Sequence, residues 1–155
     1  MTKINYSVLN KIFDNDCFFQ SVGAEYVLDE NGKFGLEVQL GEGNVNHCDT
    51  IHGAYYLGLL DITAGAAVII SEQEKYSSLP REQIKLVTCE ANLKFLDKML
   101  PNDRIRSTII SAIKGYKGRY EVIIKIMKKT EIGWKDTAFG YVQMKDCVHD
   151  MKSRL

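Results

Sequence analysis

The residues best suited to chemistry lie at the start and in the middle of one apolar segment. The run NHCDTIHGAYYLGLLDITAGAAVII, residues 46–70, opens with polar side chains and then carries a single carboxylate, Asp61. Moving an unpaired carboxylate out of water costs several kcal/mol, so this position needs an explanation. Two explanations stand. Asp61 is either a structural residue satisfied by the backbone or by Thr63, or a general base or nucleophile held in a dry pocket.

The start of the same segment offers a place where negative charge can develop. We expect a helix here, capped by Asp49 or Thr50, whose first N–H groups near Gly53 point outward at the positive end of the helix dipole. Such groups stabilise an oxyanion, and glycine lets a carbonyl approach closely, although a helical glycine also serves close packing. The amide of Asn46 can donate to the same oxygen. We expect His52 to position the ligand or to make a structural hydrogen bond.

An oxyanion pocket with one carboxylate favours thioester hydrolysis. The leaving thiol has a pKa of about 8.5 and departs as thiolate, whereas an amide or ordinary ester needs a stronger acid. The cluster His47, Cys48 and His52 lacks a fourth ligand with zinc-like spacing, so no metal is expected. Cys48 has no companion base at a telling distance in sequence, so a cysteine nucleophile is not favoured.

The spacing of the two elements adds a constraint. Gly53 and Asp61 are eight residues apart, which is about 12 Å along a helix. They cannot both act on one carbonyl from the same chain. A two-fold dimer with antiparallel helices brings the helix start of one subunit opposite Asp61 of the other. The sequence therefore predicts an obligate homodimer, alone or as a dimer of dimers.

The elements around this segment indicate how it is held. Residues 7–13 predict a short covering helix, and AEYVLDENGKFGLEVQL predicts a hairpin that turns at Asn31 and Gly32. In IKLVTCEANLKFL, Val87, Cys89, Ala91, Leu93 and Phe95 alternate with polar residues, as in a half-buried strand. Further strand-like runs follow the breakers LPND, KGYKG and EIGW: residues 104–113, 119–128 and 135–145.

The resulting order is β-β-α-β-β-β-β. A helix that is apolar almost all the way round must be wrapped by the sheet. We therefore predict an α+β hotdog fold, in which a curved antiparallel sheet of five to six strands surrounds one long central helix.

Composition limits the class of protein. The chain has 155 residues, 45% hydrophobic and 26% charged, which predicts one domain over residues 1–155. The formal net charge is zero, so neither nucleic acid nor an anionic membrane is an expected partner. Four cysteines without a CxxC pair, after an N-terminus without a secretory signal, predict reduced thiols in the cytoplasm. Segment 51–70 approaches membrane-spanning length, but His52 and Asp61 favour a buried helix.

The motif Asn46-x5-His52-Gly53-x7-Asp61 resembles the N-x5-HGG-x6-D signature of the PaaI-type (phenylacetate-degradation) acyl-CoA thioesterases of the hotdog superfamily. The similarity extends through LVTCEANLKFLDKMLPND and covers roughly residues 20 to 145. The resemblance implies that Asn46 and the Gly53 amide bind the thioester oxygen and that Asp61 activates water or attacks the carbonyl. It also implies that His52 orients the loop and the thioester, and that Thr88 orients the water. Without it, Thr88 reads as a strand residue facing solvent.

The sequence departs from the signature at one point. The second glycine of HGG is Ala54, and Tyr55 and Tyr56 follow it, so we expect Ala54 and Tyr55 to shape the acyl pocket. This departure keeps a non-catalytic acyl-CoA binding or sensing protein open as an alternative, together with a thioesterase for acyl carrier protein. No cofactor is implied beyond the coenzyme A of the substrate. The acyl preference stays open.

Overall fold

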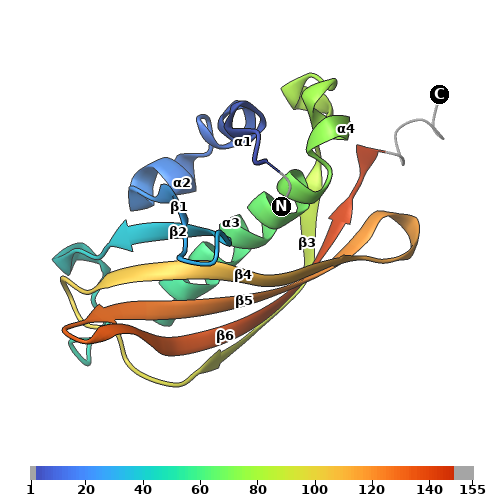
Figure 1. Cartoon of the computed structure of the whole chain (residues 1–155). Helices are drawn as coiled ribbons and strands as arrows, with labels where there is room; N and C mark the ends of the chain where they lie inside the picture. Colours follow the sequence, from blue (N-terminus) through green and yellow to red (C-terminus); the bar gives the residue numbers. More distant parts are fainter. Residues whose placement is uncertain (1–2, 149–155) are drawn as a thin grey trace.

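The structure is a computed structural model that describes residues 3–148. Six strands and one long helix carry the architecture, and shorter helices join or cover them (Figure 1). In chain order, the α-helices and strands are α1 (Tyr6–Phe13), α2 (Cys17–Val22), β1 (Glu25–Leu28), β2 (Phe34–Gln39), α3 (Gly53–Ser71), α4 (Gln73–Ser77), β3 (Leu86–Phe95), β4 (Arg104–Lys114), β5 (Arg119–Thr130) and β6 (Gly133–Asp146). Three 3-10 turns lie at Glu42–Asn44, Arg81–Gln83 and Tyr116–Gly118.

The strands form one antiparallel sheet in the order β1-β2-β4-β5-β6-β3, which curves under α3 (Figure 1). The alternation of buried and exposed side chains along the strands explains why one face of the sheet packs against α3. In β5, Tyr120, Val122, Ile124 and Ile126 are buried beneath the helix, while residues between them face outward. The predicted hotdog fold and the predicted β-β-α-β-β-β-β order along the chain are confirmed, whereas the pairing of β3 with β6 was not predicted.

Helix α3 forms the centre of the core. Every residue of α3 from Ile62 to Ile69 is buried. Over an apolar stretch of 18 residues of this helix, 61% is buried inside the protein. Its length and composition match those of a membrane span, but here the sheet supplies the apolar surroundings. A Cβ at Gly140 of β6 would lie 2.1 Å from Cδ1 of Leu60, so glycine at this position lets the strand pack closely against the helix.

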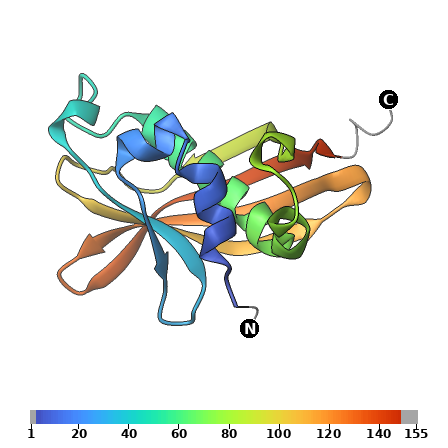
Figure 2. The ribbon, with the colours of Figure 1, turned by 90° about the horizontal axis from the view of Figure 1, so that it is seen from above.

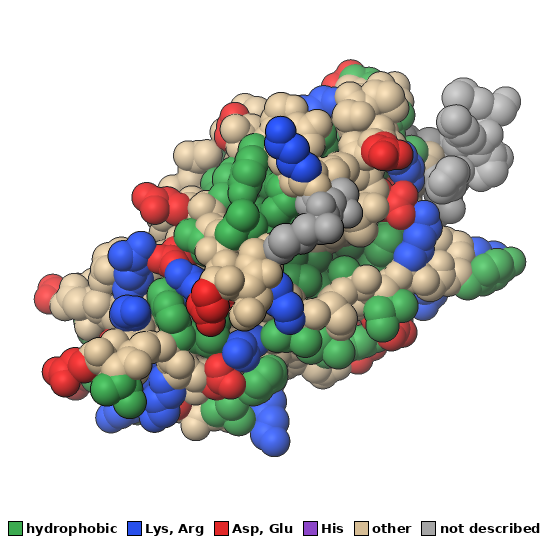
Figure 3. Space-filling model, viewed as in Figure 1, with side chains coloured by type: hydrophobic (Ala, Val, Ile, Leu, Met, Phe, Trp, Pro, Cys, Tyr) green, Lys and Arg blue, Asp and Glu red, His purple; other side chains and the backbone are tan. Residues whose placement is uncertain are grey.

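Helices α1 and α2 cover the side of α3 that faces away from the sheet (Figure 2). On the face of the molecule drawn in Figure 3, Lys and Arg side chains are interspersed with Asp and Glu side chains. The predicted helix over residues 7–13 is found as α1, whereas α2 was not predicted. Asp16 caps α2 by accepting a hydrogen bond from the N–H of Phe19 at 2.8 Å, and Gly23 ends it in the left-handed conformation. These two residues are the local signal for a helix too short to show periodicity.

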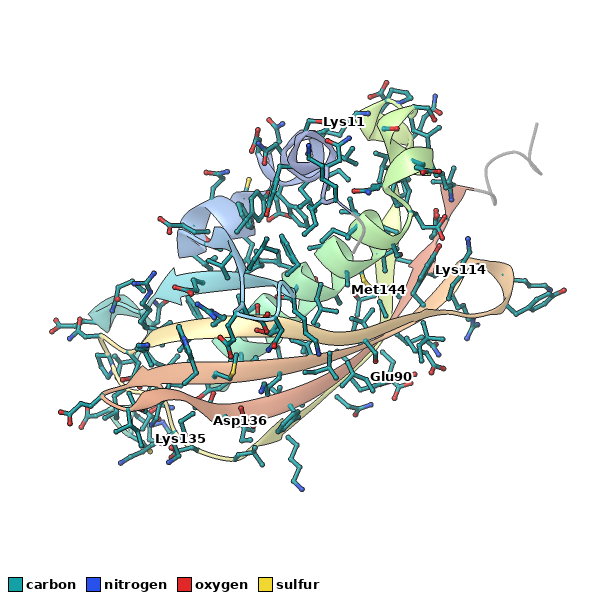
Figure 4. The ribbon with its side chains drawn as sticks, viewed as in Figure 1. Lys11, Glu90, Lys114, Lys135, Asp136 and Met144 are labelled. Carbon is teal, nitrogen blue, oxygen red and sulfur yellow. The ribbon has the colours of Figure 1, made fainter. Side chains whose placement is uncertain are left out.

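Strand β3 forms one edge of the sheet and differs from its predicted pattern. A bulge at Cys89 shifts the register against β6, so that Thr88 pairs with Met144 and Glu90 with Gln143. Figure 4 shows Met144 on the side of the sheet that faces α3 and Glu90 on the opposite side. The predicted alternation is therefore wrong before the bulge. Thr88 shares the helix side of the sheet with Ala91, Leu93 and Phe95.

A buried ion pair fastens the far end of β6 to α4. The carboxylate of Asp146 pairs with Lys75 and accepts hydrogen bonds from the hydroxyl of Tyr76 at 2.7 Å and the N–H of Val148 at 2.9 Å. Burial alone would raise the pKa of Asp146, but its hydrogen bonds with Lys75 and Tyr76 outweigh burial and lower it. Because Asp146 also pairs with Leu86, this cluster supports the start of β3.

Candidate active site

The start of α3 is capped by a histidine. The Nδ1 of His52 accepts a hydrogen bond from the N–H of Ala54 at 3.2 Å, and His52 has the extended backbone of a cap residue. The predicted caps, Asp49 and Thr50, are wrong because both residues lie in the preceding loop. His52 therefore has a structural role in setting where the helix begins.

This cap leaves one amide of the first turn free. The N–H of His52 donates to the carbonyl of Asn44 and that of Tyr55 to the carbonyl of His52, both at 2.9 Å, while Ala54 donates to the imidazole. Among the residues that the structure describes, the N–H of Gly53 has no partner. It is also the group at which the helix dipole is most positive. The geometry thus leaves at Gly53 a free donor of the kind that can stabilise an oxyanion.

Asn46 organises the loop before the helix. Its Oδ1 accepts from the N–H of Cys48 at 2.8 Å, and its Nδ2 donates to Oγ1 of Thr50 at 2.9 Å. An amide nitrogen carries two hydrogens, so the second remains available to a ligand. Asn46 is therefore held by its own loop and keeps one donor.

A pocket of about 420 Å³ opens at the helix start. Gly53, Tyr56 and Phe95 are among its lining residues, and the rings of Tyr56 and Phe95 meet edge to face with centroids 5.0 Å apart. A Cβ at Gly53 would lie 3.3 Å from Cζ of Phe95, so a larger side chain would narrow the pocket. Burial raises the pKa of Tyr56 to about 12.

The two residues predicted to contact substrate lie elsewhere on the first turn. Ala54 is exposed, and Tyr55 packs against Phe18 of α2 with ring centroids 6.3 Å apart. Neither lines the pocket at Gly53. The tyrosine that does so is Tyr56, which the departure from the HGG pattern also included.

Asp61 lies two turns further along α3 and is exposed in the isolated chain. The prediction that Asp61 is buried is wrong for the isolated chain, because the sheet covers the neighbouring faces of the helix, which carry Ile62 and Thr63. The hydroxyl of Thr88 donates a hydrogen bond to Oδ1 of Asp61. The bulge at Cys89 makes this contact available by turning Thr88 toward the helix. The sequence carried no pattern that located the bulge.

Strand β3 passes both ends of the candidate site. Phe95 lies beside Gly53, while Thr88 lies beside Asp61. Within one chain, the free amide and the carboxylate remain about 12 Å apart along the helix. The structure brings together Asp61 with Thr88, and Gly53 with His52 and the Asn46 loop, as two separate half-sites.

No protein-family model matches the sequence, and no curated protein matches it. Among solved structures, the PaaI protein from the phenylacetic acid degradation operon of E. coli is similar, with a TM-score of 0.65 and 14% identity over 90% of this chain and 95% of that chain. A thioesterase family protein from Silicibacter pomeroyi gives a TM-score of 0.66 and 14% identity over 89% and 96%. A mutant 4-hydroxybenzoyl CoA thioesterase complexed with 4-hydroxybenzoyl CoA gives a TM-score of 0.59 and 10% identity, over 72% of this chain and 81% of that chain. These similarities show a PaaI-like hotdog fold.

Proposed function

We propose that the protein is an acyl-CoA thioesterase that works as a two-fold dimer. The observation that carries this proposal is the position of the two half-sites at opposite ends of one exposed edge strand. The free Gly53 amide lies near Phe95, and the hydrogen-bonded pair of Asp61 and Thr88 lies at the other end. Two half-sites that are complementary in chemistry and separated within one chain are completed by a second copy.

The edge strand supplies the symmetry. If two β3 strands pair antiparallel about an axis at Asn92, position 91 of one chain lies opposite position 93 of the other. Because the bulge at Cys89 takes up one residue, position 88 then lies opposite position 95. Asp61 of one subunit then faces the Gly53 amide of its partner, which makes two identical sites. Pairing also covers the unpaired backbone and the apolar side chains of the edge, which favours association.

The proposed reaction uses each half-site for one task. The thioester oxygen accepts hydrogen bonds from the Gly53 N–H and from the remaining Nδ2 hydrogen of Asn46, which stabilise the charge of the tetrahedral intermediate. Thr88 donates to Oδ1 of Asp61, so Oδ2 is left to accept a proton from water. The water oxygen bonds to the carbonyl carbon, and the carbon–sulfur bond breaks. Coenzyme A leaves as thiolate and the acyl group as free acid, and Asp61 returns the proton taken from water to the thiolate or to solvent, without a resident cofactor.

The acid-base part is tested by thiol release from a panel of acyl-CoA substrates. We expect Asp61→Asn to lower kcat by at least about a hundredfold because the base is lost. The matched control is Asp136→Asn on β6, whose side chain is 41% exposed and forms an ion pair with Lys125. This control should retain wild-type rates.

The same variants separate the alternatives. A binding measurement with a thioether analogue of acyl-CoA, which cannot be hydrolysed, should give similar affinities for wild type and Asp61→Asn. Equal rates of thiol release in both would remove Asp61 from the mechanism. Tight binding of acyl-CoA with no release by either protein would instead identify an acyl-CoA sensor. Hydrolysis of acyl groups bound to acyl carrier protein, without hydrolysis of acyl-CoA, would identify the acyl carrier protein thioester as the substrate.

A further inference from the structure

A second pocket, of about 180 Å³, lies directly beside Asp61. It is bounded by α1, α3 and the sheet, and its lining residues include Ile12, Phe13, Asp61, Gly65, Leu86 and Met144. Asp61 and Asp16 are the charged residues of its lining, and the others are apolar side chains and Gly65. It is distinct from the pocket at Gly53, with which it shares no lining residue.

We propose that this pocket holds the acyl group of the substrate and that Phe13 and Gly65 set its depth. The inference rests on the proposed thioesterase function and names the substrate class. A carboxylate that activates water must stand next to the reacting carbonyl, so the acyl chain needs apolar space within reach of Asp61. This pocket provides that space, because it begins at Asp61 and continues along the same face of α3 to Gly65, one turn further.

Gly65 is the residue that keeps the pocket open. A glycine inside a helix is less stable than alanine by roughly 0.5–1 kcal/mol, so this position forgoes stability. A Cβ at Gly65 would meet Cζ of Phe13 at 3.7 Å, an ordinary contact, and therefore nothing in the packing forbids alanine. An alanine methyl would, however, occupy space between the helix and Phe13. The glycine is explained by a requirement for volume.

Helix α1 supplies the opposite wall. Phe13 is 5% exposed and Ile12 is half-buried, and both line the pocket from α1. This gives the covering helix a role in specificity. A volume of 180 Å³ corresponds to about six atoms or groups at roughly 30 Å³ each, the share of one water in the liquid. The pocket therefore fits short, branched or single-ring acyl groups and excludes long chains.

The charge of the lining narrows the class further. Asp16 accepts a hydrogen bond from the N–H of Phe19 as the cap of α2, which uses its carboxylate as an acceptor. With Asp61, it places two carboxylates around an apolar interior. An acyl group that ends in its own carboxylate would bring like charges together in this pocket. We expect neutral acyl groups to be preferred over acyl groups of the same length that end in a carboxylate.

The test compares kcat/KM for acetyl-, butyryl-, hexanoyl-, octanoyl- and decanoyl-CoA in wild type, Gly65→Ala and Phe13→Leu. Wild type should be most active on butyryl- or hexanoyl-CoA. Gly65→Ala should lower the hexanoyl-to-acetyl ratio about tenfold, since one methylene in a tight pocket is worth about that factor. Phe13→Leu should raise the octanoyl-to-butyryl ratio by a similar factor. Succinyl-CoA should be a poorer substrate than butyryl-CoA.

The control is Phe34→Leu on β2, which makes the same change at a residue that is also 5% exposed and does not line the pocket. Its acyl profile should equal that of wild type. An unchanged profile in both Gly65→Ala and Phe13→Leu would overturn the inference while leaving the thioesterase intact. If wild type hydrolyses no substrate, the proposed function fails. The pocket assignment is then decided by the affinities of S-alkyl-CoA analogues of the same chain lengths. Gly65→Ala should weaken binding of the six-carbon analogue relative to the two-carbon one, and Phe13→Leu should favour the eight-carbon analogue over the four-carbon one.

Discussion

The two edges of the sheet are built in opposite ways. Strand β1 has four residues, and its Tyr26 lies in an aromatic cluster with Tyr6, Phe19 and Phe34 at centroid distances of 5.9, 5.4 and 5.8 Å. Strand β3 has ten residues, and its apolar side chains remain uncovered, with Val87 46% and Phe95 53% exposed. The β1 edge is short and protected within the chain. The β3 edge is long, apolar and unpaired, which is the form of an interface.

The largest effect is expected from breaking the β3 edge. Ala91 is exposed in the isolated chain and lies near the proposed two-fold axis. Ala91→Arg would place two like charges together there, so we expect monomers by sedimentation and at least about a hundredfold loss of kcat/KM. Leu28→Arg, at a residue of β1 whose side chain is 49% exposed, should leave both assembly and activity unchanged. Full activity from a monomeric Ala91→Arg variant would disprove the composite site.

The support beneath β3 can be tested through pH. Asp146→Asn removes the buried ion pair with Lys75, and we expect it to lower the free energy of unfolding by about 2 kcal/mol at pH 7. The folded pKa of Asp146 is lowered from about 3.8, so its stabilisation is complete above that pH and is lost as the pH falls through the folded pKa. In urea titrations, the difference in the free energy of unfolding between wild type and Asp146→Asn should therefore be smaller at pH 3 than at pH 7. A constant difference would contradict the ion-pair explanation.

A smaller effect is expected from the hydroxyl that the bulge brings to the site. Thr88→Val keeps the shape of the strand but removes the hydrogen bond to Asp61, so kcat should fall about tenfold with little change in KM. Thr88→Ser should restore most of the rate because it restores the donor. If valine and serine behave alike, Thr88 contributes only packing.

The smallest effect concerns the protected edge. The hydroxyl of Tyr26 is buried without a hydrogen-bond partner among the described residues. Tyr26→Phe should therefore raise the free energy of unfolding by about 1 kcal/mol, measured by urea titration. Activity should not change, because β1 is remote from both half-sites. A loss of stability would show that the hydroxyl has a partner, such as a bound water.

The contrast between the edges also explains how far the sequence could be interpreted. The breakers LPND, KGYKG and EIGW separated the strand-like runs that form β4, β5 and β6, and the turn at Asn31 and Gly32 located the hairpin of β1 and β2. The apolar run around Asp61 predicted the central helix. These elements are determined by local turn signals and by burial within one chain, and both leave a signal in the sequence.

The candidate site was harder to predict because its geometry depends on backbone details. No periodicity indicates that a bulge at Cys89 turns Thr88 toward Asp61, or that His52 takes the capping role in place of Asp49 or Thr50. The exposure of Asp61 was missed because an apolar helix was assumed to be covered by its own sheet. The motif supplied the identities of these residues, and only the fold supplied their contacts.

The pairing of β3 with β6 has a consequence for the order of assembly. Strands β5 and β6 are consecutive and pair locally, but β3 pairs with a strand that is synthesised only after β4 and β5. Contacts between distant segments form slowly, since the intervening chain must first be ordered. We therefore expect Thr88 to take its position beside Asp61 after β6 has formed. On this expectation, synthesis of β6 comes before both the proposed pairing of β3 with a second copy and the assembly of the candidate catalytic pair.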